Sequence, residues 1–93
     1  MMVPVIENYS NIEGLITAIN DYPQLQGYLQ LKVSLANSKT VTGFPNLAAA
    51  DAGTDIIINI KKAEAADKKI GVQKSFKAIV KKVNHNEYFY ISG

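Results

Sequence analysis

The chain has 93 residues, a net charge of +2 and no cysteine, and 47% of its residues are hydrophobic. This length fits one domain with a single core, and the lack of cysteine excludes disulfides and thiolate metal sites. No apolar run approaches the roughly 20 residues of a membrane-spanning helix, and residues 1–7 lack the basic leader of a secretory signal. We therefore expect a cytoplasmic protein.

Charge is divided unevenly along the chain. Residues 1–55 contain two lysines and five acidic residues, whereas residues 56–93 contain eight lysines and three acidic residues. This asymmetry indicates either an anionic partner or a solvated lysine face that keeps the protein in solution. Because the chain has no arginine, any contact with phosphate would depend on lysine point charges.

The N-terminal segment is ambiguous. Residues 3–6 are apolar but include Pro4, which restricts them to an edge strand or to an N-terminal arm over residues 1–9. Residues 10–20 fit a helix that starts with a capping box, and they equally fit a strand that begins near Gly14. We favour the strand, which Pro23 would end.

The stretch 28–35 is the clearest strand, because apolar and polar side chains alternate along it. One face carries Leu29, Leu31, Val33 and Leu35, and the other carries Tyr28, Gln30, Lys32 and Ser34. Residues 36–39 have the composition of a turn, and the β-branched segment 40–44 predicts the second strand of an antiparallel hairpin. Pro45 cannot donate to a ladder and would end that strand.

The middle of the chain predicts a short helix and a buried strand. Asn46 is placed to cap a helix of under two turns over residues 47–52, which Gly53 would end. Residues 55–60 form the most apolar run and predict a strand that is buried on nearly both faces. The charged, alanine-rich residues 61–69 fit either a solvated loop or one more helical turn.

The C-terminal segments predict a closing hairpin. Residues 75–83 fit a helix or a strand, but the turn-like residues 84–87 and the β-forming residues 88–91 favour two strands. On the last strand Phe89 and Ile91 face one side, and Tyr88 and Tyr90 face the other. The tyrosines either pack into the core, which we favour, or form an exposed pair flanked by Lys77 and Lys81.

Together these elements predict a mainly β domain: a small five- to six-stranded antiparallel Greek-key barrel with one short helix. The pattern resembles the OB-fold (oligonucleotide/oligosaccharide-binding) superfamily. The matching segments are 14–19, 28–35, 40–44 and 55–60 as the first four strands and 47–52 as the helix. The resemblance implies a ligand face on the second and third strands. That face would hold Tyr28, Gln30, Lys32 and Ser34, together with Thr40, Thr42 and Phe44.

We expect from these patterns a non-enzymatic domain that binds single-stranded nucleic acid with low sequence specificity through lysine and aromatic side chains. The candidate binding residues are Tyr28, Gln30, Lys32, Lys39, Phe44, Lys77, Lys81, Tyr88 and Tyr90. Tyr28 and Phe44 would stack on bases, and the lysines would contact phosphates. The alternative is a protein–protein assembly module or a homo-oligomeric subunit with no role in nucleic-acid binding.

A catalytic centre is not expected. His85 is the only histidine, and no serine, threonine or lysine has the partner pattern of a nucleophile. Asp51 and Asp55 are separated by Gly53, which argues against a shared helical face. We expect no cofactor, no bound metal and no membrane partner.

Overall fold

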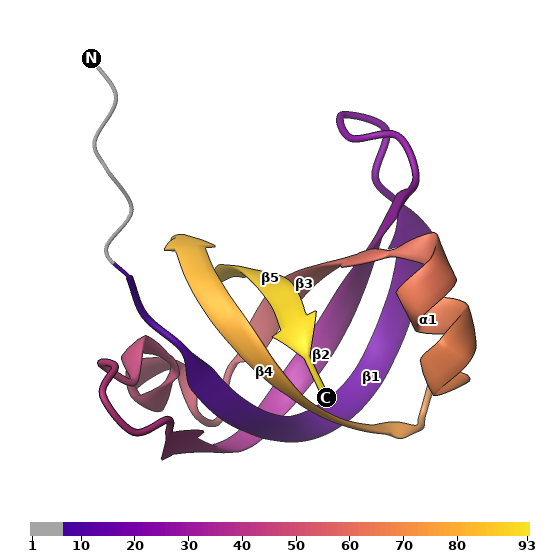
Figure 1. Cartoon of the computed structure of the whole chain (residues 1–93). Coiled ribbons are helices and arrows are strands. Elements are labelled where there is room, and N and C mark those ends of the chain that lie inside the picture. The colour runs from indigo at the N-terminus through magenta and orange to yellow at the C-terminus, as the bar shows by residue number, and fades with distance from the viewer. Residues whose placement is uncertain (1–6) are drawn as a thin grey trace.

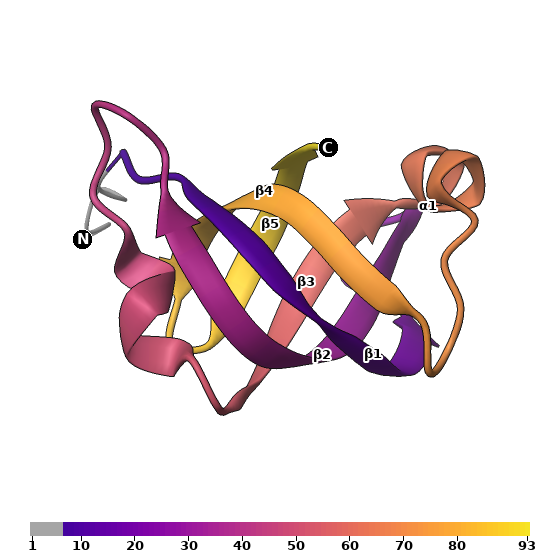
Figure 2. The same ribbon diagram turned by 90° about the horizontal axis from the view of Figure 1, so that it is seen from below.

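The structure, a computed structural model, describes residues 7–93; most of the expected N-terminal arm therefore lies outside the described residues. Five strands close into a barrel in the order β1-β2-β3-β5-β4, and β4 pairs back with β1 (Figures 1 and 2). The strands are β1 (Ser10–Asp21), β2 (Tyr28–Thr40), β3 (Asp55–Lys61), β4 (Ser75–Asn84) and β5 (Glu87–Ser92).

Two short helices lie at opposite ends of this barrel. The 3-10 helix η1 (Leu47–Asp51) follows β2, and the α-helix α1 (Lys62–Lys68) connects β3 to β4 (Figure 2). Each helix buries one alanine, Ala48 in η1 and Ala65 in α1. Helices of five and seven residues are too short to be stable alone, so their packing on the barrel holds them.

The expected fold class is confirmed: the chain is mainly β, and its five strands form a closed barrel with one short α-helix. One junction differs from the expectation, because β3 and β5 pair in parallel over Ile57–Asn59 and Glu87–Phe89. The other four junctions are antiparallel. The parallel junction arises because the β4–β5 hairpin places β5 between β3 and β4.

The predicted hairpin between residues 28–35 and 40–44 is wrong. Residues 36–39 continue β2 rather than turning, because they pair with β1: Asn37 lies opposite Glu13, and Lys39 lies opposite Asn11. Segment 41–46 then leaves the sheet through a turn in which Gly43 has a φ of +90°. The antiparallel partner of β2 on its other side is β3, at residues 55–61.

The ambiguous segments are resolved in favour of strands. Residues 10–20 lie in β1, which begins at Ser10 rather than near Gly14, and residues 75–83 lie in β4. The β1–β2 register shifts between Glu13 and Gly14, where the two backbones approach so closely that a Cβ on Gly14 would lie 2.5 Å from the Ser34 carbonyl oxygen. Residues 62–68 form α1, and the expected helix over 47–52 is present as η1.

The inward faces of all five strands form the core. The predicted alternation of residues 28–35 is confirmed, because Leu31, Val33 and Leu35 are buried and Leu29 packs against them. The remaining buried strand residues that are hydrophobic are Ile12, Ile16, Ile56, Ile58, Ile60, Phe76, Ala78, Val80 and Tyr88. No helix within residues 7–93 is long and apolar enough to cross a membrane.

A polar network closes the η1 end of the barrel. The Tyr88 hydroxyl donates to Asp51 Oδ2 over 2.5 Å, and Lys82 Nζ donates to the same oxygen over 2.8 Å. The Asn8 side chain exchanges two hydrogen bonds with the backbone of Lys82, at 2.9 and 3.0 Å. Burial acts to raise the pKa of Asp51, but the bonds from Lys82 and Tyr88 outweigh it and hold that pKa below its ordinary value.

Candidate functional site

The outer face of β2, β3 and β5 carries a chain of side-chain hydrogen bonds. Gln30 Nε2 on β2 donates to Asn59 Oδ1 on β3 over 3.0 Å, and Asn59 Nδ2 donates to Glu87 Oε2 on β5 over 2.7 Å. Asn59 is only 1% exposed, so its amide is satisfied by these neighbours. The three strands are thereby tied together on the side that faces away from the core.

An aromatic pair lies on the same face. The rings of Tyr28 and Phe89 have centroids 6.0 Å apart and planes inclined by 30°, and both side chains are half-buried. Tyr28 is a predicted site residue, whereas Phe89 is absent from the predicted set. Alternation along β5 could have identified Phe89 as a site residue, because Phe89 must face outward once Tyr88 and Tyr90 face the core.

A cleft of about 490 Å³ lies beside this face, between the β1–β2 loop (residues 22–27) and the β4–β5 turn. In Figure 1 this loop projects beyond the barrel between β1 and β2. The cleft is lined by Tyr22, Gln24, Gln30, Ile57, Asn84, His85, Asn86 and Glu87. Its walls therefore offer hydrogen-bonding side chains and two rings, with a single carboxylate and no lysine.

Backbone hydrogen bonds hold both walls of the cleft. The Ile57 N–H donates to the Asn86 carbonyl over 2.8 Å, which fixes the β4–β5 turn against β3. The Tyr22 N–H donates to the Tyr28 carbonyl over 3.2 Å and closes the base of the loop. Asn86 has a φ of +49°, as expected for asparagine in a tight hairpin turn.

The predicted lysines do not form one stripe. Lys32 pairs with Asp55 at 3.6 Å, Lys77 with Glu13 at 3.4 Å, and Lys81 with Glu7 at 2.9 Å. The ladders place Lys32 opposite Ala18 of β1 and Lys77 opposite Glu13. These β1 positions are five residues apart, which is roughly 16 Å along a strand.

Two of the predicted lysines lie over β1, on another side of the barrel. Lys39 and Lys77 line a small hollow over β1 together with Asn37 and Glu13. Hydrogen bonds from Asn37 and then Lys77 lower the pKa of the Glu13 carboxyl. This pair is therefore arranged around a carboxylate, and the structure does not bring it to the cleft.

The predicted exposed tyrosine pair is wrong, because the side of β5 that carries it faces the core. Tyr88 is 0% exposed, and burial followed by the hydrogen bond to Asp51 raises the pKa of its hydroxyl. Tyr90 packs against the core, with its ring centroid 6.4 Å from that of Phe76. The favoured alternative, burial of these tyrosines, agrees with this placement.

Phe44 is separated from the other predicted aromatics. It lies in the segment after β2 and makes an edge-to-face contact with Tyr9, with ring centroids 4.6 Å apart. It is 37% exposed. Of the nine predicted site residues, the structure thus brings Tyr28, Gln30 and Lys32 together on β2 and places the other six in the core or elsewhere on the barrel.

Comparison of the chain with protein-family models, with curated proteins and with solved structures gives no match. Within residues 7–93, no group of three or more Asp, Glu or His side chains is placed to hold a metal ion. Fold and site together define a small closed β-barrel with a polar, partly aromatic cleft on the outer face of β2, β3 and β5.

Proposed function

We propose that this chain is an OB-fold module that binds single-stranded nucleic acid, without catalysis, on the outer face of β2, β3 and β5. OB-folds bind oligonucleotides and oligosaccharides on the face of strands 2 and 3 and in the loops that join strands 1–2 and 4–5. The cleft here is bounded by the same elements, the 22–27 loop, the β4–β5 turn and residues of β2 and β3.

The observation that carries the proposal is the Tyr28–Phe89 pair beside an amide-lined cleft. Exposed ring faces bind bases of any sequence, at about 1–3 kcal/mol per stacked base. Amide side chains such as Gln24 and Asn84 can both donate to and accept from base edges. This combination favours bases over phosphates as the groups held in the cleft.

Few cations accompany this face. Lys32 is half-exposed beside Asp55, and Lys61 is exposed and lies opposite Tyr28 in the β2–β3 ladder. Two phosphate contacts on a single strand give a slope of log affinity against log salt of about −1.4. The proposed binding is therefore of modest affinity and has a shallow dependence on salt.

The test is a fluorescence-anisotropy titration with labelled single-stranded DNA and single-stranded RNA at low and moderate salt. Phe89→Ala removes one ring of the pair and is expected to weaken binding by about 5- to 150-fold, the equivalent of one stacked base. Phe44→Ala removes an exposed ring outside this face and is the control. No binding at low salt, or equal losses in the two variants, would contradict the proposal.

A second candidate function, self-assembly, is favoured by the apolar side chains near η1. Phe44 and Leu47 are each 37% exposed, and the Tyr9 ring contacts Phe44. Barrel closure leaves few strand edges for pairing, although residues 36–40 of β2 pair with β1 and have no partner in β3. Sedimentation velocity at high protein concentration tests this candidate, and a strict monomer would contradict it.

A further inference from the structure

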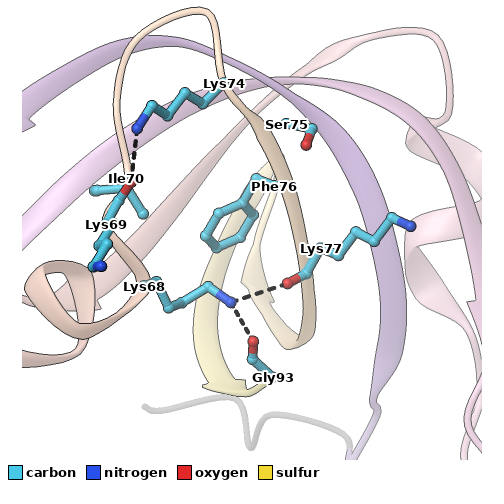
Figure 3. Close-up of a pocket in the computed structure, with 8 residues that line it drawn as sticks. All are labelled: Lys68, Lys69, Ile70, Lys74, Ser75, Phe76, Lys77 and Gly93. Atoms are coloured by element: carbon cyan, nitrogen blue, oxygen red, sulfur yellow. Dashed lines mark hydrogen bonds between the residues drawn. The ribbon is translucent and has the colours of Figure 1, made fainter.

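A second hollow, of about 470 Å³, lies at the α1 end of the barrel (Figure 3). It is formed by the C-terminal end of α1, the loop that leads to β4, the start of β4 and Gly93. Its lining residues are Lys68, Lys69, Ile70, Lys74, Ser75, Phe76, Lys77 and Gly93. Half of them are lysines and none is aspartate or glutamate, and the hollow shares no lining residue with the cleft on β2 and β3.

Lys68 is held in place by backbone oxygens and aromatic rings. Its ammonium donates to the backbone oxygens of Lys77, over 3.2 Å, and of Gly93. It also lies 5.3 Å from the ring centroid of Phe76 and 5.5 Å from that of Tyr90. These contacts fix the position of the ammonium group at the edge of the hollow.

Lys69 and Lys74 stand on a loop that backbone hydrogen bonds tie to the barrel. The Gln73 N–H donates to the Ile16 carbonyl over 2.7 Å, and the Ile16 N–H donates to the Lys74 carbonyl over 2.9 Å. Lys69 ends α1 in the left-handed conformation, with a φ of +53°. Lys74 Nζ reaches back to the Lys69 carbonyl at 3.4 Å. The two charges are therefore carried by a held segment next to Lys68.

These three lysines differ from most other lysines within residues 7–93, because no Asp or Glu side chain forms an ion pair with them. The ion pairs among residues 7–93 involve Lys32, Lys62, Lys77, Lys81 and Lys82. Lys77 also lines the hollow, but its ammonium is directed away from Phe76 (Figure 3) and pairs with Glu13. Three like charges around one hollow repel each other, and a multiply charged anion placed between them would remove that repulsion.

We propose that this hollow binds a polyphosphate group through Lys68, Lys69 and Lys74. Lysine binds phosphate as a flexible point charge. Three lysines favour a ligand with several negative charges over a ligand with a single carboxylate. Ser75 adds a hydroxyl donor at the rim, and the volume is of the size that holds a small ligand. The phosphates belong either to a free polyphosphate or nucleotide, or to successive positions of a nucleic-acid strand.

The experiment titrates the full chain with inorganic tripolyphosphate at low salt, by calorimetry and by amide chemical shifts. The test variant is Lys69→Gln with Lys74→Gln, which removes both charges and leaves slightly shorter polar side chains at two exposed positions. The control is Lys39→Gln with Lys62→Gln, which removes the same charge outside the hollow. We expect shifts within residues 68–77 and a loss of affinity of about tenfold in the test variant, with less than a twofold loss in the control.

Other results would overturn the proposal. These are no binding at millimolar tripolyphosphate, equal losses in the two variants, or shifts centred outside residues 68–77. A parallel titration with a single strand separates the two phosphate sources. If the strand displaces tripolyphosphate and binds the test variant less tightly, the phosphates that the hollow holds are those of a nucleic-acid strand.

The site stands apart from the proposed strand-binding face. Phe89→Ala is expected to leave tripolyphosphate affinity unchanged. If the chain binds tripolyphosphate but no single strand, this inference holds and the proposed function is contradicted.

Discussion

At each end of the barrel a lysine ammonium lies beside an aromatic ring, but the two lysines have different hydrogen-bond partners. At the η1 end Lys82 Nζ lies 5.7 Å from the Tyr88 ring centroid and 2.8 Å from Asp51 Oδ2. At the α1 end Lys68 Nζ lies 5.3 Å from the Phe76 ring centroid, and the backbone oxygens of Lys77 and Gly93 accept its hydrogen bonds. The two lysines therefore differ in whether an aspartate side chain accepts from the ammonium group.

Burial explains why Lys82 is paired with a carboxylate whereas Lys69 and Lys74, beside Lys68, are not. The side chains of Lys82 and Asp51 are 21% and 16% exposed, and charges withdrawn from water to this extent are stable only when they are paired and hydrogen-bonded. Lys69 and Lys74 are exposed, so water already solvates them and no partner is required. We therefore expect substitutions at the η1 end to change stability and substitutions at the α1 end to change binding.

The largest expected effect is that of Tyr88→Ala. This change removes a fully buried ring and the hydrogen bond to Asp51, and it should lower the free energy of unfolding by about 3–5 kcal/mol. Urea denaturation followed by circular dichroism measures the loss. A loss below about 1 kcal/mol would mean that the η1 end does not depend on this side chain.

Asp51→Ala should have the next largest effect. It leaves both the Lys82 ammonium and the Tyr88 hydroxyl without their shared acceptor, at a cost of about 1–3 kcal/mol in the free energy of unfolding. Asp55→Ala is the control, since Asp55 lies in an exposed pair with Lys32 and should cost less than about 1 kcal/mol. Equal losses would remove the distinction between buried and exposed pairs.

The same pairing predicts a pH dependence. Because the pKa of Asp51 is lower in the folded protein than in the unfolded chain, its contribution is complete above about pH 4 and is lost as the pH falls through the folded value. The difference in unfolding free energy between wild type and Asp51→Asn should therefore shrink over the acidic range below about pH 4. A difference that stays constant across this range would contradict the assignment.

At the alkaline end the sign is reversed. The pKa of Tyr88 is raised in the folded protein, so its contribution is complete below the unfolded value of about 10 and is lost at higher pH. Tyr88→Phe should flatten this alkaline loss. Denaturation at pH 8 and above about pH 10 measures it.

The smallest expected effect on stability is at the α1 end. Lys69→Gln with Lys74→Gln should change the free energy of unfolding by less than about 0.5 kcal/mol, with any gain largest at low salt, where like-charge repulsion is least screened. Thermal melts at low and high salt measure this. A large destabilisation would show that these lysines support the fold and would break the comparison between the two ends.

The barrel was predictable from the sequence because strict alternation, as in residues 28–35, is a local signal of one buried face. The path through residues 36–44 was not. Residues 36–39 have a composition typical of turns, but pairing with β1 keeps them in the strand, and partners so distant in sequence leave no local mark. The helix over 62–68 stayed undecided for a related reason, since seven residues depend on packing rather than propensity.

The candidate site was only partly predictable. The outward positions of Tyr28, Gln30 and Lys32 follow from alternation, and all three lie on β2 as expected. Alternation also separates Phe89 from Tyr88 and Tyr90, but an aromatic strand gives no sign of which side faces the core. The α1-end lysines were visible as a basic segment, although only the ion pairs of the folded chain show which of them have no carboxylate.

The seam between β1 and β4 governs when this protein can fold. Leu15 pairs with Ser75 and Ser10 with Val80, so the paired residues are 60 to 70 positions apart in the sequence. Contacts of such high sequence separation make folding slow, because a long loop must close before they form. During synthesis β1 and β2 can associate early, but the barrel has to remain open until the ribosome has released both β4 and β5, because β5 lies between β3 and β4. Before β4 pairs with β1, one edge of β1 is unpaired, and an unpaired edge exposes the nascent chain to strand-mediated aggregation.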